Sequence, residues 1–321
     1  MIRRILGWAA AILVVSVVGL LITIQLRWKR TFEATLPAIT ASTDSTVIAM
    51  GRYLAFGPAH CAECHTSGAA AAALERGEQP PLSGGFEFNI PPGKFRTPNL
   101  TPDSATGIGA ATDGALARMI RYGVRRDGRA GLPFMNYHDL SDADLTALIS
   151  FLRSQPPVVH AVPAHDLTLL GKGVMAFLIK PVGPTGTPPA VSPAGPTVER
   201  GAYLVGSVAE CADCHTQRSM MDGHFTGPRL AGGTAFTSDS DATMEFVPPN
   251  LTPDPKTGRI AAWSEDQFVA RFRQGRLLPG SPMPWKAFGH MSDDDLRAIY
   301  RYLHSLPPVE RETGPSQRKK R

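Results

Sequence analysis

An internal repeat constrains the fold of this chain more than any other feature of its sequence. Four motifs occur twice, always 150 or 151 residues apart: Gly-x-Tyr-Leu at 51–54 and 201–204, Cys-Ala-x-Cys-His-Thr at 61–66 and 211–216, Pro-Asn-Leu-Thr-Pro-Asp at 98–103 and 249–254, and Ser-Asp-x-Asp-Leu at 141–145 and 292–296. Similarity at a constant offset indicates a duplicated structural unit. We therefore predict two copies of one domain, over residues 46–160 and 197–311.

The two copies of Cys-x-x-Cys-His contain every cysteine of the chain. On one helical turn, two thiols three residues apart can each form a thioether to the same porphyrin, and the next histidine can reach the iron. The sequence therefore predicts two haem c groups. Their covalent attachment sites are Cys61, Cys64, Cys211 and Cys214, and their proximal ligands are His65 and His215.

Three other uses of these cysteines explain the pattern less well. A thioredoxin-like site would require an α/β domain, which the sequence does not indicate. A structural zinc ion requires four ligands, and pooling the four cysteines would leave both histidines unused. A structural disulfide does not need the histidine at all.

A methionine in the loop before the last helix of each repeat is the predicted sixth iron ligand. Met135 and Met283 lie 70 and 68 residues after His65 and His215, each in a proline-containing loop. Methionine opposite histidine raises the potential of a haem iron. His138 and His290 are rival ligands, although a place on the polar surface is the commoner role for such residues. The other internal methionines are interpreted as core filler: Met50, Met119, Met175, Met220, Met221, Met244 and Met291.

Each repeat is predicted to be mainly α-helical. First helices are expected over 46–56 and 197–207, and last helices over 142–154 and 293–305. Thr112 and Ser264 are predicted N-caps of a middle helix. No segment alternates convincingly as a strand. The Asn-Leu-Thr-Pro-Asp segments are expected to orient the proximal histidine, through a backbone carbonyl or a threonine hydroxyl that accepts its Nδ1–H.

The N-terminus has the composition of a membrane anchor. Ile5 to Leu26 is a run of 22 residues without a charge, which spans roughly 33 Å as a helix and can cross a bilayer. A cleaved signal peptide has a shorter apolar core and a small-residue cleavage site, so an uncleaved anchor over 1–30 is favoured, followed by a tether over 31–45. Haem c attachment occurs outside the cytoplasm. The expected location is therefore the bacterial inner membrane, with a single pass and both haem domains in the periplasm.

The formal charge of +5 lies at the two ends of the chain. Residues 1–45 carry five basic and two acidic side chains, and the tail over 312–321 carries four and one. A nucleic-acid-binding surface needs basic residues on a folded face, so that class of partner is excluded.

Residues 161–196 are interpreted as a linker rich in proline and glycine. Within it, the apolar segment 167–179 is too short to span a bilayer, and a short helix packed on a domain is favoured over contact with the membrane surface.

The succession of repeated motifs resembles the cytochrome c subunits of bacterial membrane-bound alcohol, aldehyde and gluconate dehydrogenases. The resemblance covers both repeats, although those subunits typically carry three haem domains. The fold predicted here departs from theirs: it is mainly α, with an N-terminal transmembrane helix followed by two tandem cytochrome c domains. The resemblance also implies an electron-transfer protein rather than an enzyme. Such subunits take electrons from a separate catalytic dehydrogenase subunit and pass them to quinone or a terminal oxidase. The expected redox partners are a dehydrogenase subunit, a quinol-oxidising complex or a terminal oxidase. A di-haem peroxidase is the alternative, although it usually needs dissimilar haem domains. A sensor would need a signalling domain.

Overall fold

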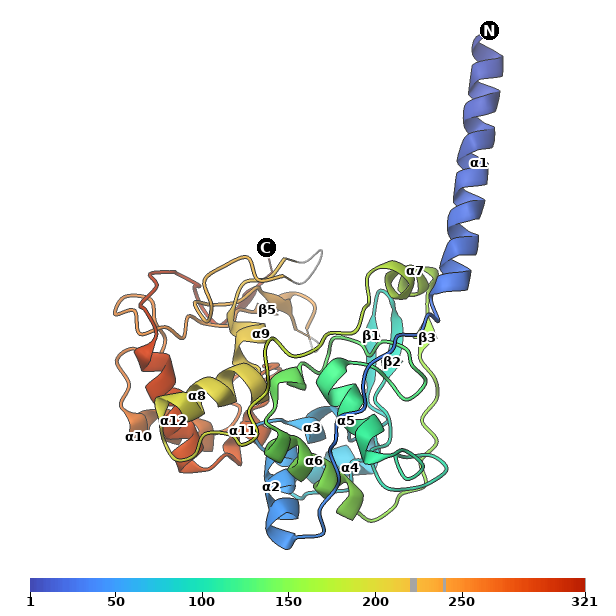
Figure 1. Cartoon of the computed structure of the whole chain (residues 1–321). Coiled ribbons are helices and arrows are strands. Elements are labelled where there is room, and N and C mark those ends of the chain that lie inside the picture. Colours follow the sequence, from blue (N-terminus) through green and yellow to red (C-terminus); the bar gives the residue numbers. More distant parts are fainter. Residues whose placement is uncertain (220–223, 239–240, 321) are drawn as a thin grey trace.

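The N-terminal helix projects away from two helical units that lie side by side (Figure 1). The computed structural model describes residues 1–219, 224–238 and 241–320. Helix α1 (Ile2–Arg27) is long and apolar enough to cross a membrane, and its apolar residues are exposed rather than packed inside the protein. The first unit follows the tether, and the second unit forms the other half of the body.

The helices follow the same order in the two units, except that α4 has no counterpart among the described residues of the second unit. The first contains α2 (Ser45–Phe56), α3 (Cys61–Cys64), α4 (Gly68–Glu75), α5 (Asp113–Tyr122), the 3-10 turn η1 (Tyr137–Asp139) and α6 (Asp142–Ser154). The second contains α8 (Val198–Tyr203), the π-turn η2 (Leu204–Val208), α9 (Cys211–His215), α10 (Glu265–Arg273), α11 (Trp285–Gly289) and α12 (Asp293–Ser305). Between them lies α7 (Leu169–Phe177).

The predicted helix starts are confirmed by their caps. Thr112 accepts a hydrogen bond from the backbone of Ala115, and Ser264 forms a reciprocal capping box with Gln267. Ser141 and Ser292 cap α6 and α12. Each cap satisfies a backbone N–H that has no partner inside its helix. These local signals explain why both last helices begin where the sequence predicts.

The first and last helices of each unit cross in close contact at a glycine. A Cβ atom on Gly51 would overlap the carbonyl oxygen of Ala147, and one on Gly201 would overlap that of Ala298. This contact explains the glycine of the repeated Gly-x-Tyr-Leu motif, because only a residue without a side chain lets the two backbones approach so closely.

Replacing Gly201 with alanine is expected to destabilise the second unit by about 1–3 kcal/mol, because the two helices must move apart. Helix propensity alone would favour alanine by about 1 kcal/mol. A loss of stability would therefore point to the close contact between the helices, and a gain would point to helix propensity. Denaturant unfolding measures the effect, and Gly186→Ala, which has no atom within 4 Å of the added carbon, is the control. An unchanged or higher stability of the Gly201 variant would contradict the crossing contact.

The expectation that no segment forms a strand is wrong. The described residues include two three-stranded antiparallel sheets, ordered β1-β2-β3 and β4-β5-β6. Their strands are β1 (Glu87–Ile90), β2 (Gly93–Arg96), β3 (Asp166–Leu167), β4 (Phe236–Thr237), β5 (Met244–Phe246) and β6 (Gln317–Lys319). Strands of two to four residues are too short to show the two-residue alternation on which a sequence prediction depends.

The segments predicted as tether, linker and basic tail are all held against the units. The tether pairs with the first unit through the backbone of Phe32 and Gly128 (2.7 Å) and through the Ala41 N–H and Asp113 (2.8 Å). Strand β3 lies at the start of the predicted linker and β6 inside the predicted tail, whose last residue is outside the described ranges. Since β3 and β6 are 151 residues apart, the repeat continues beyond 160 and 311.

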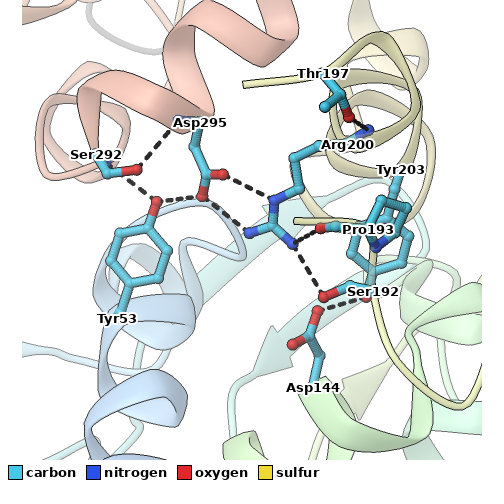
Figure 2. A network of polar contacts seen from close by, with 9 residues as sticks. All are labelled: Tyr53, Asp144, Ser192, Pro193, Thr197, Arg200, Tyr203, Ser292 and Asp295. Carbon is cyan, nitrogen blue, oxygen red and sulfur yellow. Dashed lines mark hydrogen bonds and ion pairs between the residues drawn. The ribbon is translucent and has the colours of Figure 1, made fainter. Parts of the chain in front are cut away.

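The two units bind each other through a reciprocal pair of tyrosines (Figure 2). Tyr53 of α2 donates to Asp295 of α12 (2.6 Å), and Tyr203 of α8 donates to Asp144 of α6 (2.7 Å). Each tyrosine oxygen also accepts a backbone N–H at the cap of the other unit's last helix. Burial, reinforced by the neighbouring carboxylate, raises the pKa of both phenols well above the usual range, so each remains a donor.

One side chain breaks the symmetry of this interface. Arg200 of α8 forms a bidentate ion pair with Asp295 (2.8 and 3.0 Å) and reaches Ser192 in the linker (3.0 Å). The repeat places Met50 at the corresponding position in the first unit, and Met50 is 42% exposed. The core-filler interpretation is therefore wrong for Met50 and correct for Met291, which is 2% exposed. Met220 and Met221 lie outside the described residues.

Candidate haem-binding sites

Both Cys-x-x-Cys-His runs form a single helical turn with an unusual entry. The residue before each turn, His60 or Glu210, has a left-handed backbone with φ of 38° and 51°. This conformation is uncommon for a residue other than glycine. It ends the preceding segment sharply and starts a new turn that carries both thiols. The two turns are thus built in the same way despite different residues at the entry.

The histidine of each run is buried and oriented by a backbone carbonyl. His65 is 6% exposed and its Nδ1 lies 3.1 Å from the Pro98 oxygen, while His215 is 9% exposed and lies 2.9 Å from the Pro249 oxygen. Because a carbonyl only accepts, Nδ1 donates its proton and Nε2 keeps a lone pair. Burial lowers the pKa of His65 to about 4 and lowers that of His215, so both rings are neutral as a metal ligand must be.

The carbonyl that orients each histidine belongs to the repeated Pro-Asn-Leu-Thr-Pro-Asp loop, as predicted. In the first unit the loop is fixed by Asn99. Its Oδ1 accepts hydrogen bonds from Thr101, and its Nδ2 donates to the Val158 carbonyl (2.8 Å). Asn250 makes the same contacts with Thr252 and Val309 in the second unit. This motif therefore acts by holding the proximal histidine in place.

The four cysteines form no disulfide with one another, and their environments do not favour thiolate chemistry. Burial, with a smaller effect of Cys64, raises the pKa of Cys61 to about 12, and burial and Cys214 raise that of Cys211 to about 12. A redox-active Cys-x-x-Cys pair has a lowered pKa instead. Among the described residues, no group of three or more His, Cys, Asp or Glu side chains is placed to hold a metal ion. The donor set therefore fits thioether attachment better than a zinc site or a thioredoxin-like site.

The candidate sixth ligands are half-buried and pack against the core together with Cys61 and Cys211. Met135 lies in the loop before η1, and Met283 lies just before α11. Of the rival ligands, His290 is exposed, as expected. The expectation of a surface position is wrong for His138, which is 8% exposed because its ring packs under α5 with Nδ1 3.2 Å from the Ile120 oxygen. That contact occupies one ring nitrogen.

Sequence reasoning missed the tyrosine that ties the methionine loop of the first unit to its cysteine turn. The Tyr137 hydroxyl donates to the carbonyl of Ala59, two residues before Cys61 (2.6 Å). The repeat places Phe288 at the corresponding position, which has no hydroxyl. Because the interaction has no counterpart in the second unit, comparison of the two copies gave no signal for it.

The two cysteine turns also lie beside the contact between the units. Next to the first turn, the His60 ring packs edge-on against Phe288 of α11, with 5.6 Å between ring centroids. Inside the second turn, Asp213 accepts from Asn136, the neighbour of Met135 (2.5 Å). Each turn is therefore in contact with the methionine-bearing region of the other unit.

Comparisons with known proteins match each unit separately. A family described as cytochrome c matches residues 51–156, and one described as cytochrome C oxidase, cbb3-type, subunit III matches residues 196–303. These two regions contain both Cys-x-x-Cys-His turns and both candidate methionines.

Several curated proteins are similar over most of this chain. The cytochrome c subunit of a quinone alcohol dehydrogenase from Gluconobacter oxydans is 32% identical over 83% of this chain and 56% of its own length. The gluconate 2-dehydrogenase cytochrome c subunit of Pantoea cypripedii is 30% identical, over 82% and 60%. A diheme cytochrome c-type protein of Cereibacter sphaeroides is 28% identical, over 78% and 83%.

The chain spans between 56% and 64% of the length of the alcohol dehydrogenase subunits that it matches. Despite that difference in length, two cytochrome c regions and relatives named as cytochrome c proteins agree with the fold and with the chemistry of both turns. Residues 51–156 and 196–303 are therefore two tandem cytochrome c domains, and two such domains, together with the similarity to a diheme cytochrome c-type protein, support two haem c groups.

Proposed function

We propose that each domain attaches its haem through its own cysteine turn and that the chain relays single electrons between the two haems. The proposed sites are Cys61, Cys64, His65 and Met135 in one domain, and Cys211, Cys214, His215 and Met283 in the other. The observation that carries the proposal is the repeated turn with its buried, carbonyl-oriented histidine. The domains then correspond to residues 46–160 and 197–311, each extended by its third strand.

The haem supplies reversible one-electron chemistry, and the protein fixes where it sits and how readily it is reduced. His65 and His215 present a neutral imidazole held by Pro98 and Pro249, which prevents rotation of the ring. The contacts of His60 with Phe288 and of Asn136 with Asp213 hold the two turns against one interface. This arrangement supports direct transfer between the haems within one chain.

Replacing Met135 with alanine is expected to convert the first haem to high spin and lower its reduction potential, because the thioether that favours the reduced iron is lost. Met283→Ala is expected to do the same to the second haem only. Absorption spectra and redox titration measure both changes, and Met291→Ala, a buried core methionine near the second loop, is the control. If either loop variant leaves both haems unchanged, the ligand assignment fails for that domain and His138 or His290 is tested next.

We further propose that α1 anchors the chain in the bacterial inner membrane, with both domains in the periplasm. The support is the uncharged run Ile5–Leu26 and the exposure of α1 along its length. The proposed donor is the catalytic subunit of a dehydrogenase, in line with the names of the relatives, and the proposed acceptor is a terminal oxidase. A quinol-oxidising complex is a further candidate partner in the membrane. The three relatives described above are named as cytochromes, which gives the peroxidase alternative no support.

These partners are tested with the purified holoprotein in detergent. Catalytic subunits of alcohol and gluconate dehydrogenases, each with its own substrate, should differ in the rate at which they reduce the haems, and one of them should do so rapidly. Inner-membrane vesicles should reoxidise the reduced chain in a cyanide-sensitive reaction. Reduction that is equally slow with every dehydrogenase would overturn the proposed donor class. Cyanide-insensitive reoxidation would overturn a terminal oxidase as acceptor.

A further inference from the structure

Helix α7 presents an apolar face that the protein does not cover. Leu169 and Leu170 are each 58% exposed, Phe177 is 39% exposed and Leu178 is 66% exposed. Leu170, Val174, Phe177 and Leu178 follow the i, i+4, i+7, i+8 spacing of a single helix face. The expectation of a short helix packed on a domain is correct, but Leu169, Leu170, Phe177 and Leu178 are exposed.

The opposite face of α7 is fixed to the first domain. A Cβ atom on Gly171 would overlap the Pro92 carbonyl, and the Thr168 N–H donates to the same carbonyl (3.1 Å). Ala176 is completely buried. The turn between β1 and β2 thus holds α7 rigidly, so its apolar side chains cannot fold back into the domain.

Helix α7 also lies against the last turns of α1 (Figure 1). Ile24 is the one buried residue of α1, and its side chain lies 3.8 Å from the position of a Cβ on Gly173. Arg27 lies over the Phe177 ring (5.7 Å), and Arg30 donates to the Ile179 carbonyl (2.8 Å). The exposed face of α7 therefore sits at the level where α1 would leave the bilayer.

The residues around this contact are of the kinds that are found at the lipid headgroup layer of a membrane. The ammonium groups of Lys29 and Lys172 lie 4.7 and 5.4 Å from the centroid of the Trp28 ring, and Lys180 is exposed just beyond α7. Tryptophan and basic side chains prefer the membrane interface, where the ring is partly buried and the cation meets phosphate. The same composition, next to an apolar helix face, is typical of helices that lie in the interface.

We propose that α7 lies in the outer headgroup region of the membrane and docks the first domain on the lipid surface. This proposal rests on the membrane anchoring by α1 proposed above. Lipid is the occupant that the contacts favour, because α7 lies against the last turns of α1, whose exposed apolar residues would face lipid. The first domain would then be held at a fixed height and orientation, whereas a flexible tether would let it turn freely.

The test places spin labels on the full-length holoprotein in vesicles of phosphatidylcholine and phosphatidylglycerol, with both haems reduced. Leu170→Cys and Leu178→Cys report on α7, and Ile12→Cys reports on the span. Leu277→Cys, on the second domain and 58% exposed like Leu170, is the matched reference for water. The ratio of accessibility to oxygen over accessibility to a water-soluble nickel chelate is expected to be several-fold higher at 170 and 178 than at 277.

The three positions separate the possible outcomes. If Ile12 is protected from nickel while both α7 labels resemble Leu277, α1 spans the bilayer but α7 faces water, and the docking proposal is overturned in favour of a surface left open for a protein partner. If Ile12 itself is accessible to nickel, the anchoring proposal fails first. High ratios at 12, 170 and 178 together support the docked arrangement.

Discussion

Replacing Cys211 and Cys214 with serine is expected to remove one of the two haems completely and to leave the other attached. Serine keeps the size of the side chain but cannot form the thioether, and His215 alone does not hold a haem covalently. The first domain has its own turn, its own histidine and its own supporting loop, so it is expected to mature normally. Intact mass and haem content per chain measure the loss.

The matched variant carries the same two substitutions in the first domain. Cys61→Ser with Cys64→Ser should retain only the second haem, and the two variants should have complementary redox titrations. Loss of both haems from either variant would mean that the domains do not mature independently. An unchanged mass, or bound zinc in the unmodified chain, would refute the attachment sites.

The sequence was most informative where a local signal repeats. Serine and threonine caps predicted the starts of the middle and last helices, because capping depends on residues two or three positions apart. The Cys-x-x-Cys-His spacing predicted both turns, and the position of the Pro-Asn-Leu-Thr-Pro-Asp loop predicted what orients the histidine. Each of these features is contained in a few consecutive residues.

Features that depend on distant residues were not predictable in the same way. Strands β3 and β6 each follow a last helix and pair with a hairpin about 70 residues earlier in the chain, in segments that resemble a linker and a tail. His138 is buried by its packing under α5, which its sequence neighbours do not indicate. The exposed apolar face of α7 was ambiguous because length and composition fit either a domain or a membrane surface.

The repeated sequence did not indicate that its two copies contact each other, although the interface between them is built from repeated residues. Tyr53 and Tyr203 belong to the Gly-x-Tyr-Leu motif, and Asp144 and Asp295 to the Ser-Asp-x-Asp-Leu motif. The sequence of one copy alone indicates no partner for the tyrosine or for the aspartate, although the structure pairs Asp295 with Arg200 of its own unit. Only when the two units are placed face to face does each tyrosine meet the aspartate of the other copy (Figure 2).

Replacing Arg200 with methionine, the residue at the corresponding position of the first domain, is expected to lower the free energy of unfolding by about 3–5 kcal/mol. The Arg200 and Asp295 side chains are each 9% exposed, so the variant leaves a buried carboxylate whose one remaining side-chain donor among the described residues is Tyr53. Denaturant unfolding of the holoprotein measures the effect. Lys256→Met is the control, since its ion pair with Glu310 is exposed (70% and 63%) and should contribute about 0–1 kcal/mol.

A double-mutant cycle then separates folding of the second domain from docking of the two domains. Tyr53→Phe removes the hydroxyl that reaches Asp295 from the first domain, and its cost should depend strongly on whether Arg200 is present, because both residues share one carboxylate. Additive costs would mean that the two contacts act independently and that Arg200 stabilises only its own domain. A coupled cost, together with slower electron exchange between the haems in the Tyr53 variant, would identify this carboxylate as the point that holds both redox centres in register.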